Sequence, residues 1–311
     1  MSERRGAREW VALVGLVLIA ATFSVLSPGV LLAVPFALIA LAFPPRRPLT
    51  VVMAVGLLAL ILSAHGGDGL WYFERGWALL LGAWFVAFVM LLPRAGFVNR
   101  AVAAVAASAA TAAAFLALRR DGFAQLDHAV TERLRTVAGD AALAMSNVLR
   151  NSAGSSDMPS NMMKAAEMQA HLFPAMIGLA SLASLGAGWW VFRRVTVSDE
   201  QPLRPLREFR FSDHLVWVLL IGAALLLLPV DELARRAGSN LVTFMAALYA
   251  LRGIAVLVVI GGSPGPLGVV IGAVLCVVLY PLVVTATILV GLTDTWLDIR
   301  SKRPILPTPG S

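Results

Sequence analysis

A single arginine lies inside a long apolar run near the C-terminal end of the chain, where it is well placed to do chemistry. Arg252, followed by Gly253, interrupts the apolar residues 241–260. A charge in the middle of a membrane span is costly unless it faces a cavity, a partner or a helix break. We therefore predict that this helix is broken at Arg252-Gly253 and that Arg252 binds an anionic group, with Tyr249 as a polar neighbour. The alternative is an arginine that reaches the membrane surface or binds carbonyl groups freed at the break.

Two aspartates near the end of the chain form a second candidate site. Asp294 and Asp298 are four residues apart, so on a helix they share one face and could hold a cation or a basic partner. Trp296 lies between them, and aromatic residues are common at membrane surfaces. The simpler interpretation, which we favour, is therefore a helix end in water, anchored by Trp296.

A glycine-rich segment, residues 65–76, carries Trp71, Tyr72 and Phe73 and is expected to be a loop. Glycines beside aromatic residues could line the entrance for a small ligand. A flexible turn with aromatic residues at the membrane surface is the interpretation we favour.

Signatures of catalysis are missing from the sequence. The four histidines fit no zinc-binding spacing, and neither a phosphate-binding P-loop nor a G-x-S-x-G nucleophile motif occurs. The single cysteine, Cys276, excludes an intramolecular disulfide and a metal site built from several cysteines. We therefore expect neither an enzyme nor a bound metal or cofactor.

The elements that position these residues are membrane helices. The chain is 59% hydrophobic and only 14% charged, whereas soluble domains carry about 25% charged residues. Inside lipid, helices and closed barrels satisfy every backbone polar group, and the unbroken apolar runs favour helices over strands. The predicted fold is all-α, a polytopic transmembrane bundle of eight to nine spans.

Three regions follow from the spacing of the apolar runs. Residues 1–118 contain about five spans, residues 119–170 form a polar segment, and residues 171–311 contain three or four spans with a polar connector at 193–214. The last apolar run, 267–292, is longer than the roughly 20 residues that a span needs. We expect it to tilt, to protrude or to kink near Pro281.

The polar segment, residues 119–170, balances its charges and has an amphipathic pattern. Apolar residues recur at helical spacing, and a second short helix is expected at 161–170. The segment could lie on the membrane or cap the bundle. The apolar positions of the first helix are Phe123, Leu126, Val130, Leu134 and Val137.

Positive charges predict the orientation. Arginines gather before the first span and then in alternate loops, and cytoplasmic loops carry an excess of such charges. The N-terminus is therefore predicted to be cytoplasmic, with the 119–170 segment on the opposite side of the membrane. The net charge of +7 is explained in this way, without a nucleic-acid partner. Nine full spans would place Arg300, Lys302 and Arg303 outside, so the number of spans stays open between eight and nine.

Several stretches of the second half carry a family resemblance. They include WWVFRR at 189–194, FRFSDHLVW at 209–217, Asn240, ALYALRG at 247–253 and GLTDTWLDIR at 291–300. Residues 172–300 resemble the YybS-like family of predicted bacterial membrane proteins, a domain of unknown function. The resemblance implies a bacterial inner-membrane protein and a bundle similar to the substrate-binding components of energy-coupling-factor vitamin transporters. The candidate ligand-binding residues are then Arg252, Tyr249, Asn240, Asp294 and Asp298.

Two functions compete at this point. The first is binding of a small solute in transport, because broken helices often build sites at the middle of the membrane. The second is a non-catalytic scaffold or assembly subunit of a larger membrane complex. Its contacts would be the alanine-rich span 101–118 and the amphipathic segment 121–150, because small residues let helices approach closely.

Overall fold

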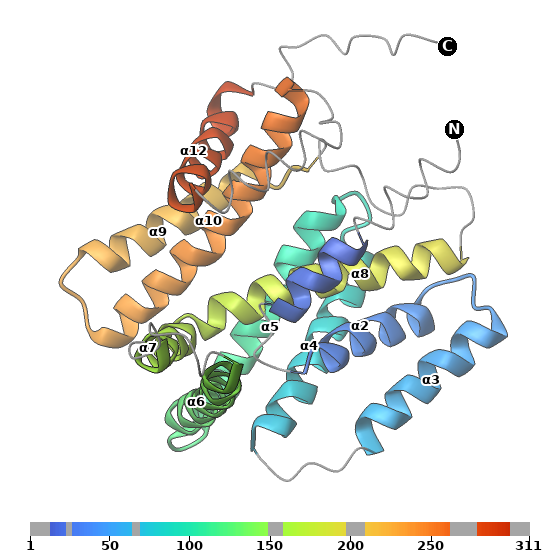
Figure 1. Ribbon diagram of the computed structural model, residues 1–311. Coiled ribbons are helices and arrows are strands. Elements are labelled where there is room, and N and C mark those ends of the chain that lie inside the picture. The colour runs from blue at the N-terminus through green and yellow to red at the C-terminus, as the bar shows by residue number, and fades with distance from the viewer. Residues whose placement is uncertain are drawn as a thin grey trace. The chain divides into compact units, whose positions relative to one another are not determined.

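The computed structural model describes residues 13–22, 27–63, 69–148, 158–196, 209–261 and 279–298, and their regular secondary structure is helical (Figure 1). This confirms the all-α prediction. Four helices are long and apolar enough to cross a membrane: α4 (Gly69–Leu91), α5 (Phe97–Leu118), α8 (Phe173–Thr196) and α10 (Glu232–Gly261). Shorter apolar helices are Leu13–Thr22, α2 (Pro28–Ala42), α3 (Pro48–Ser63), α9 (Val216–Leu227) and α12 (Tyr280–Leu297).

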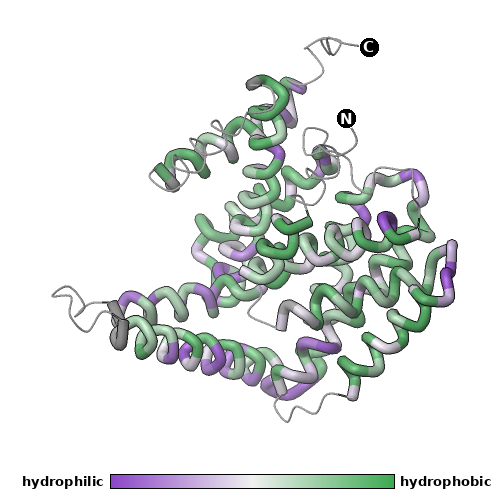
Figure 2. Tube along the Cα trace, turned by 45° about the vertical axis from the view of Figure 1, so that its right-hand side comes forward, coloured by the Kyte–Doolittle hydropathy of each residue, from purple (hydrophilic) through white to green (hydrophobic). Residues whose placement is uncertain are grey.

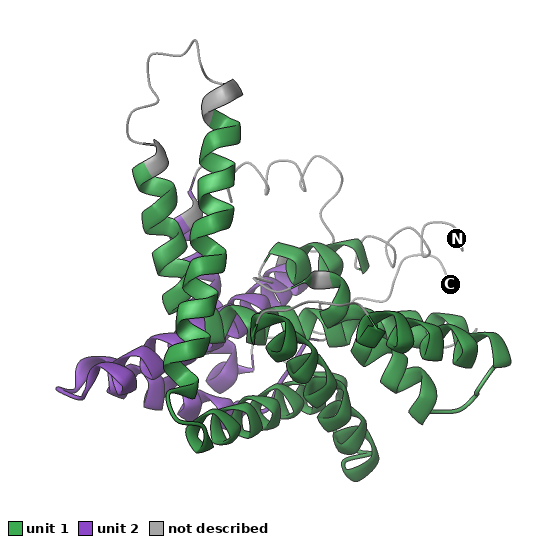
Figure 3. Cartoon of the chain, turned by 90° about the horizontal axis from the view of Figure 1, so that it is seen from below, with its two compact units in different colours: residues 1–203 green, residues 204–311 purple. Residues whose placement is uncertain are grey.

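The chain forms two compact units, residues 1–203 and 204–311 (Figure 3). Hydrophobic residues cover most of the helices, and hydrophilic residues gather at helix ends and along the pair α6 (Gly122–Val148) and α7 (Met158–His171) (Figure 2). The boundary between the units falls inside the connector predicted at 193–214. Residues 193–196 of that connector extend α8, and residues 197–208 lie outside the described part of the chain.

Helix α8 is the centre of the first unit. In its apolar stretch 72% of the residues are buried, compared with 28–39% in the other three long helices. Its small residues Ala180, Ser184 and Gly188 repeat every fourth position, and a Cβ atom on Gly188 would lie 3.5 Å from the Phe36 backbone of α2. This spacing brings the two backbones together, because small residues let helices approach closely.

Polar side chains inside the first unit are paired between helices. The indole Nε1 of Trp77 in α4 donates to Ser181 Oγ in α8 at 2.9 Å, and Nε1 of Trp84 donates to Thr111 Oγ1 in α5 at 3.1 Å. A buried indole N–H needs such a partner. These two bonds fix the rotation of α4 about its axis relative to its neighbours.

Helix α4 begins earlier than the sequence predicts. It starts at Gly69, so Trp71, Tyr72 and Phe73 are helical rather than part of a loop, and residues 64–68 lie outside the described part. The prediction of a loop over 65–76 is therefore wrong for residues 69–76. The glycines suggested a turn, but the aromatic residues continue the apolar face of the helix.

The amphipathic segment forms a pair of helices, α6 and α7, that pack on each other (Figure 3). Val130, Leu134, Ala166 and Ala170 are buried in this pair, and an exposed ion pair joins Arg135 to Glu167 at 3.3 Å. The predicted helical pattern is confirmed. The turn from α5 into α6 requires glycine, because a Cβ atom on Gly122 would crowd the carbonyl oxygen of Leu116.

The second unit is organised along α10, whose 30 residues give a length of about 45 Å. Its first half packs on α9, where Gly222 faces Leu241 and Gly238 faces Leu225. Its second half packs on α12. There the two backbones touch, because a Cβ atom on Gly253 would overlap the carbonyl oxygen of Thr287, and one on Gly291 would overlap that of Tyr249.

One prediction about these helices is wrong. Helix α10 is continuous through Arg252-Gly253, so Gly253 is a point of close helix contact and not a break. Of the last apolar run, 267–292, the structure describes residues 279–292: α12 begins at Tyr280, with Pro281 in its first turn, and extends past residue 292 to Leu297, in keeping with the expected change of course near Pro281 or protrusion. Proline fits the first turn of a helix because its missing N–H has no partner there. Residues 262–278 lie outside the described part.

Candidate functional site

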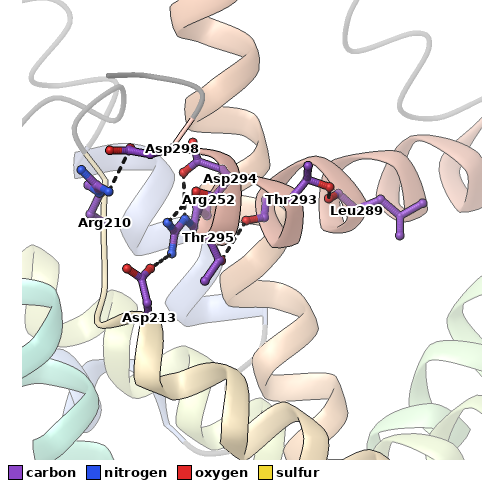
Figure 4. Close-up of polar contacts among 9 residues, drawn as sticks. Arg210, Asp213, Arg252, Leu289, Thr293, Asp294, Thr295 and Asp298 are labelled. Atoms are coloured by element: carbon purple, nitrogen blue, oxygen red, sulfur yellow. Dashed lines mark hydrogen bonds and ion pairs between the residues drawn. The ribbon is translucent and has the colours of Figure 1, made fainter. Parts of the chain in front are cut away.

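The side chain of Arg252 is fully buried and is held by two carboxylates from other elements (Figure 4). Its Nε donates to Asp294 Oδ2 at 2.9 Å, and its NH1 group donates to Asp213 Oδ1 at 2.7 Å. The NH2 group also donates to the backbone oxygen of Asp294 at 3.3 Å. A buried charge that is paired and hydrogen-bonded in this way is tolerated in an apolar setting.

The ends of two short helices create the site. Asp213 begins the 3-10 turn η2 (Asp213–Leu215), which leads directly into α9, and Asp294 lies in the last turn of α12. The start of α9 and the end of α12 therefore meet the same residue of α10. Arg252 therefore lies in a continuous helix, and the helix ends that face it belong to neighbouring elements.

The helix ends also favour the charges they carry. The carbonyl end of a helix is partly negative and stabilises a cation, which matches the bond from Arg252 to the backbone oxygen of Asp294. The amino end is partly positive and stabilises an anion, which matches Asp213 at the start of η2. Backbone and side-chain charges thus both favour this arrangement.

Asp294 lies in the interior and not in water. Its exposed fraction is 0%, whereas the favoured interpretation of the sequence placed it at the membrane surface beside Trp296. Trp296 is exposed, as expected. The interpretation is wrong for Asp294 because the helix extends five residues past the end of the predicted span, which carries position 294 into the contact with α10.

Asp298 binds a different arginine. It caps α12 in a left-handed conformation with φ of 41°, and its Oδ1 accepts from Arg210 at 3.0 Å. Both side chains are about half exposed. Asp294 and Asp298 therefore do not hold one shared cation, as their spacing allowed, but bind two separate arginines.

Tyr249 joins Arg252 in the site, one turn earlier on α10. Its ring packs edge-on against Phe211 at 5.2 Å between centroids, and the Arg252 guanidinium lies 5.4 Å from the same Phe211 ring. The Tyr249 hydroxyl is buried and has no hydrogen-bond partner among the described residues. The Thr295 hydroxyl, which lies near it, donates instead to the Gly291 carbonyl oxygen at 3.5 Å.

Asn240 is not part of this cluster. It lies twelve residues before Arg252 on the same helix, about 18 Å along the axis. Its Nδ2 donates to the Arg236 carbonyl oxygen at 2.9 Å, within its own helix. The structure therefore brings together Arg252, Tyr249 and Asp294, places Asp298 beside them through Arg210, and leaves Asn240 apart.

Sequence reasoning missed Asp213 and its neighbour Phe211. Both were assigned to the polar connector, where a carboxylate carries no signal of its own. One signal was available: a buried arginine needs a counter-ion, and Asp213 is the carboxylate directly before the preceding apolar run.

A second pair of buried charges, also missed, lies in the first unit. Glu74 of α4 accepts from the backbone N–H and the Oγ of Ser27, at 3.3 and 3.0 Å, just before the first turn of α2. Arg75 donates to the carbonyl oxygens of Ile61 and Trp71, at 2.9 and 3.3 Å, and stacks on the Trp71 ring at 3.7 Å. These groups cap helix ends and hold backbone in place.

Chemically, Arg252 already binds two anionic side chains, the carboxylates of Asp213 and Asp294. Arginine presents a planar fork of N–H donors that matches a carboxylate or phosphate. No group of three or more His, Cys, Asp or Glu side chains suited to a metal gathers within the described part of the chain. Asp213 is 55% exposed while Arg252 and Asp294 are fully buried, so the cluster reaches the surface through Asp213.

The family model described as "Predicted membrane protein (DUF2232)" matches residues 11–295. The match includes Arg252, Asp213, Asp294 and Tyr249 and ends before Asp298. It also covers the first unit from residue 11, whereas the resemblance seen in the sequence covers residues 172–300. No curated protein and no solved structure matches the chain.

Proposed function

Because the chain belongs to this family of predicted membrane proteins, its apolar helices contact a lipid bilayer, and we propose that it binds a small anionic solute at Arg252 as part of transport. The observation that carries the proposal is a fully buried guanidinium whose NH1 group binds a half-exposed carboxylate. Charged residues inside membrane segments commonly mark solute pathways.

The arrangement of helix ends supports the same proposal. Transporters often form their binding sites from helix ends that face the solute, together with nearby side chains. Here the start of η2 and α9 and the end of α12 meet Arg252 of the continuous α10. The protein acts as a binding component and not as an enzyme in this proposal.

The location belongs to the proposal as well. We place the chain in a bacterial inner membrane, with eight or nine spans and a cytoplasmic N-terminus. Support comes from the four long and five shorter apolar helices and from the arginines of alternate loops.

Thermal unfolding of the purified full chain across a panel of small anions tests the proposal. A ligand that binds the folded state raises the unfolding temperature as its concentration rises. We expect at least one anion to stabilise the wild type and to have no effect on Arg252→Lys, because lysine cannot form the fork. A broad panel with no stabilising anion would refute the proposal.

A second candidate function is that of a scaffold subunit. Its support is the outer face of α5, where the exposed alanines Ala109, Ala110, Ala113 and Ala114 leave room for another helix. Mass measurement of the complex after gentle detergent extraction tests this candidate. A co-purifying membrane protein that is lost when Ala110 and Ala114 become leucine would support it, and a monomer alone would refute it.

A further inference from the structure

Five residues cover Arg252 like a strap. These residues, 209–213, are called the strap below and lead into η2. Three of them contact Arg252 or the residues around it. Arg210 binds Asp298, Phe211 packs on Tyr249 and faces Arg252, and Asp213 binds Arg252. Phe211 is 4% exposed, so its ring seals the space beside the guanidinium.

The three contacts differ in how easily they break. The Arg210–Asp298 pair is about half exposed on both sides, and exposed pairs contribute little to stability. Asp213 is 55% exposed and uses one oxygen on one nitrogen of Arg252. Asp294, in contrast, is fully buried and makes two bonds to Arg252. A competitor would therefore displace Asp213 and leave Asp294 in place.

Building on the proposed function, we infer that Asp213 occupies the position of the solute and that the solute is a small monocarboxylate. A free carboxylate can approach NH1 and NH2 together, which a single Asp213 oxygen does not do. Its arrival releases Asp213 to water and lifts residues 209–213 from Arg252.

Charge selects the class of solute. Arg252, Asp213 and Asp294 together hold one positive and two negative charges. A monoanion that replaces Asp213 keeps this balance, whereas a dianion adds a negative charge beside the buried Asp294, which is costly. The Tyr249 hydroxyl, which is buried and has no partner in the described part of the chain, offers a further donor to the solute.

The experiment measures binding of propionate, with sulfate as the dianion, to the full chain in nanodiscs at constant ionic strength. Asp213→Ala removes the competing carboxylate, and Asp231→Ala is the matched control, because Asp231 is an exposed carboxylate of the same unit outside the cluster. We expect Asp213→Ala to bind propionate at least about tenfold more tightly than the wild type. Asp231→Ala should equal the wild type, and sulfate should bind more weakly than propionate in every variant.

Hydrogen exchange adds a readout of the strap itself. Propionate should speed exchange in the peptide that contains residues 209–213 of the wild type and leave α9 unchanged. If Asp213→Ala does not fold, Asp213→Asn serves in its place, because it keeps the shape and removes the charge.

Different results would contradict the proposed function and the inference about Asp213. If the wild type binds an anion that Arg252→Lys does not bind, but Asp213→Ala binds it no more tightly, the inference about Asp213 is wrong and the proposed function stands. Stronger binding of sulfate than of propionate would overturn the assignment to monocarboxylates. If neither the wild type nor Asp213→Ala binds any anion, the proposed function fails and the inference fails with it.

Discussion

The two units each bury an arginine, and the partners of these arginines differ. Arg75 in the first unit bonds backbone carbonyl oxygens and stacks on an indole, and its neighbour Glu74 bonds the backbone and hydroxyl of Ser27. Arg252 in the second unit bonds two carboxylates from separate elements. Backbone partners are fixed by the fold, whereas a partly exposed carboxylate can leave. The first arrangement holds structure, and the proposed function places solute binding at the second.

The largest expected effect comes from removing Arg252. Arg252→Gln leaves Asp294 buried without its counter-ion, and breaking such a pair costs about 3–5 kcal/mol. The free energy of unfolding in mild detergent measures the loss. The double variant Arg252→Gln/Asp294→Asn should recover part of it, because both charges are gone. A loss in the double variant equal to the sum of the losses in Arg252→Gln and Asp294→Asn would show that the two residues act independently.

A smaller loss is expected for Arg75. Arg75→Gln removes hydrogen bonds from a charged donor to backbone carbonyl groups, worth roughly 1.5–3 kcal/mol. The same unfolding measurement applies. Among its described contacts, Arg75 pairs with no buried carboxylate. We therefore expect that no second substitution restores the stability lost in Arg75→Gln. Recovery of stability in Arg75→Gln/Glu74→Gln would contradict this difference between the units.

The close contact between α10 and α12 gives a further prediction. Gly253→Ala places a methyl group against the carbonyl oxygen of Thr287, and overpacking of this kind costs about 1–3 kcal/mol. Gly76→Ala is the control, because a Cβ atom there meets nothing within 4 Å. A stable Gly253→Ala variant with an unchanged unfolding temperature would mean that the two helices are not in backbone contact.

The smallest effect is expected at the exposed pair. Asp298→Asn removes the ion pair with Arg210, and exposed pairs contribute about 0–1 kcal/mol, which salt weakens further. The difference from the wild type should shrink when unfolding is measured at high salt. A loss as large as that of Arg252→Gln would mean that this pair, and not Asp294, holds α12 in place.

Sequence alone could identify Arg252, because a charge within an apolar run has an unavoidable cost wherever the helix lies. Its partners were harder to predict. Asp294 lay beyond the predicted end of a span, and Asp213 lay in a polar connector, so both looked like residues in water. Their burial depends on where α12 ends and where α9 begins, and helix ends are weakly encoded in the sequence.

Glycine was the other source of error. Beside Arg252, Gly253 was interpreted as a break, and the glycines of 65–76 as a loop, because glycine weakens a helix. In this protein Gly253 instead allows two helices to touch, a role that depends on the facing residue Gly291 far along the chain. The helices themselves followed from composition and periodicity, which are local properties. The pairing of distant residues is not local and could not be predicted in the same way.

The most direct test compares the two arginines in one binding measurement. Any small carboxylate that stabilises the wild type is titrated against Arg252→Lys and Arg75→Lys, which both keep the positive charge. We expect Arg252→Lys to weaken binding at least about tenfold, because the fork is lost, and Arg75→Lys to bind as the wild type does. Equal affinity in all three proteins, or a loss confined to Arg75→Lys, would contradict this expectation.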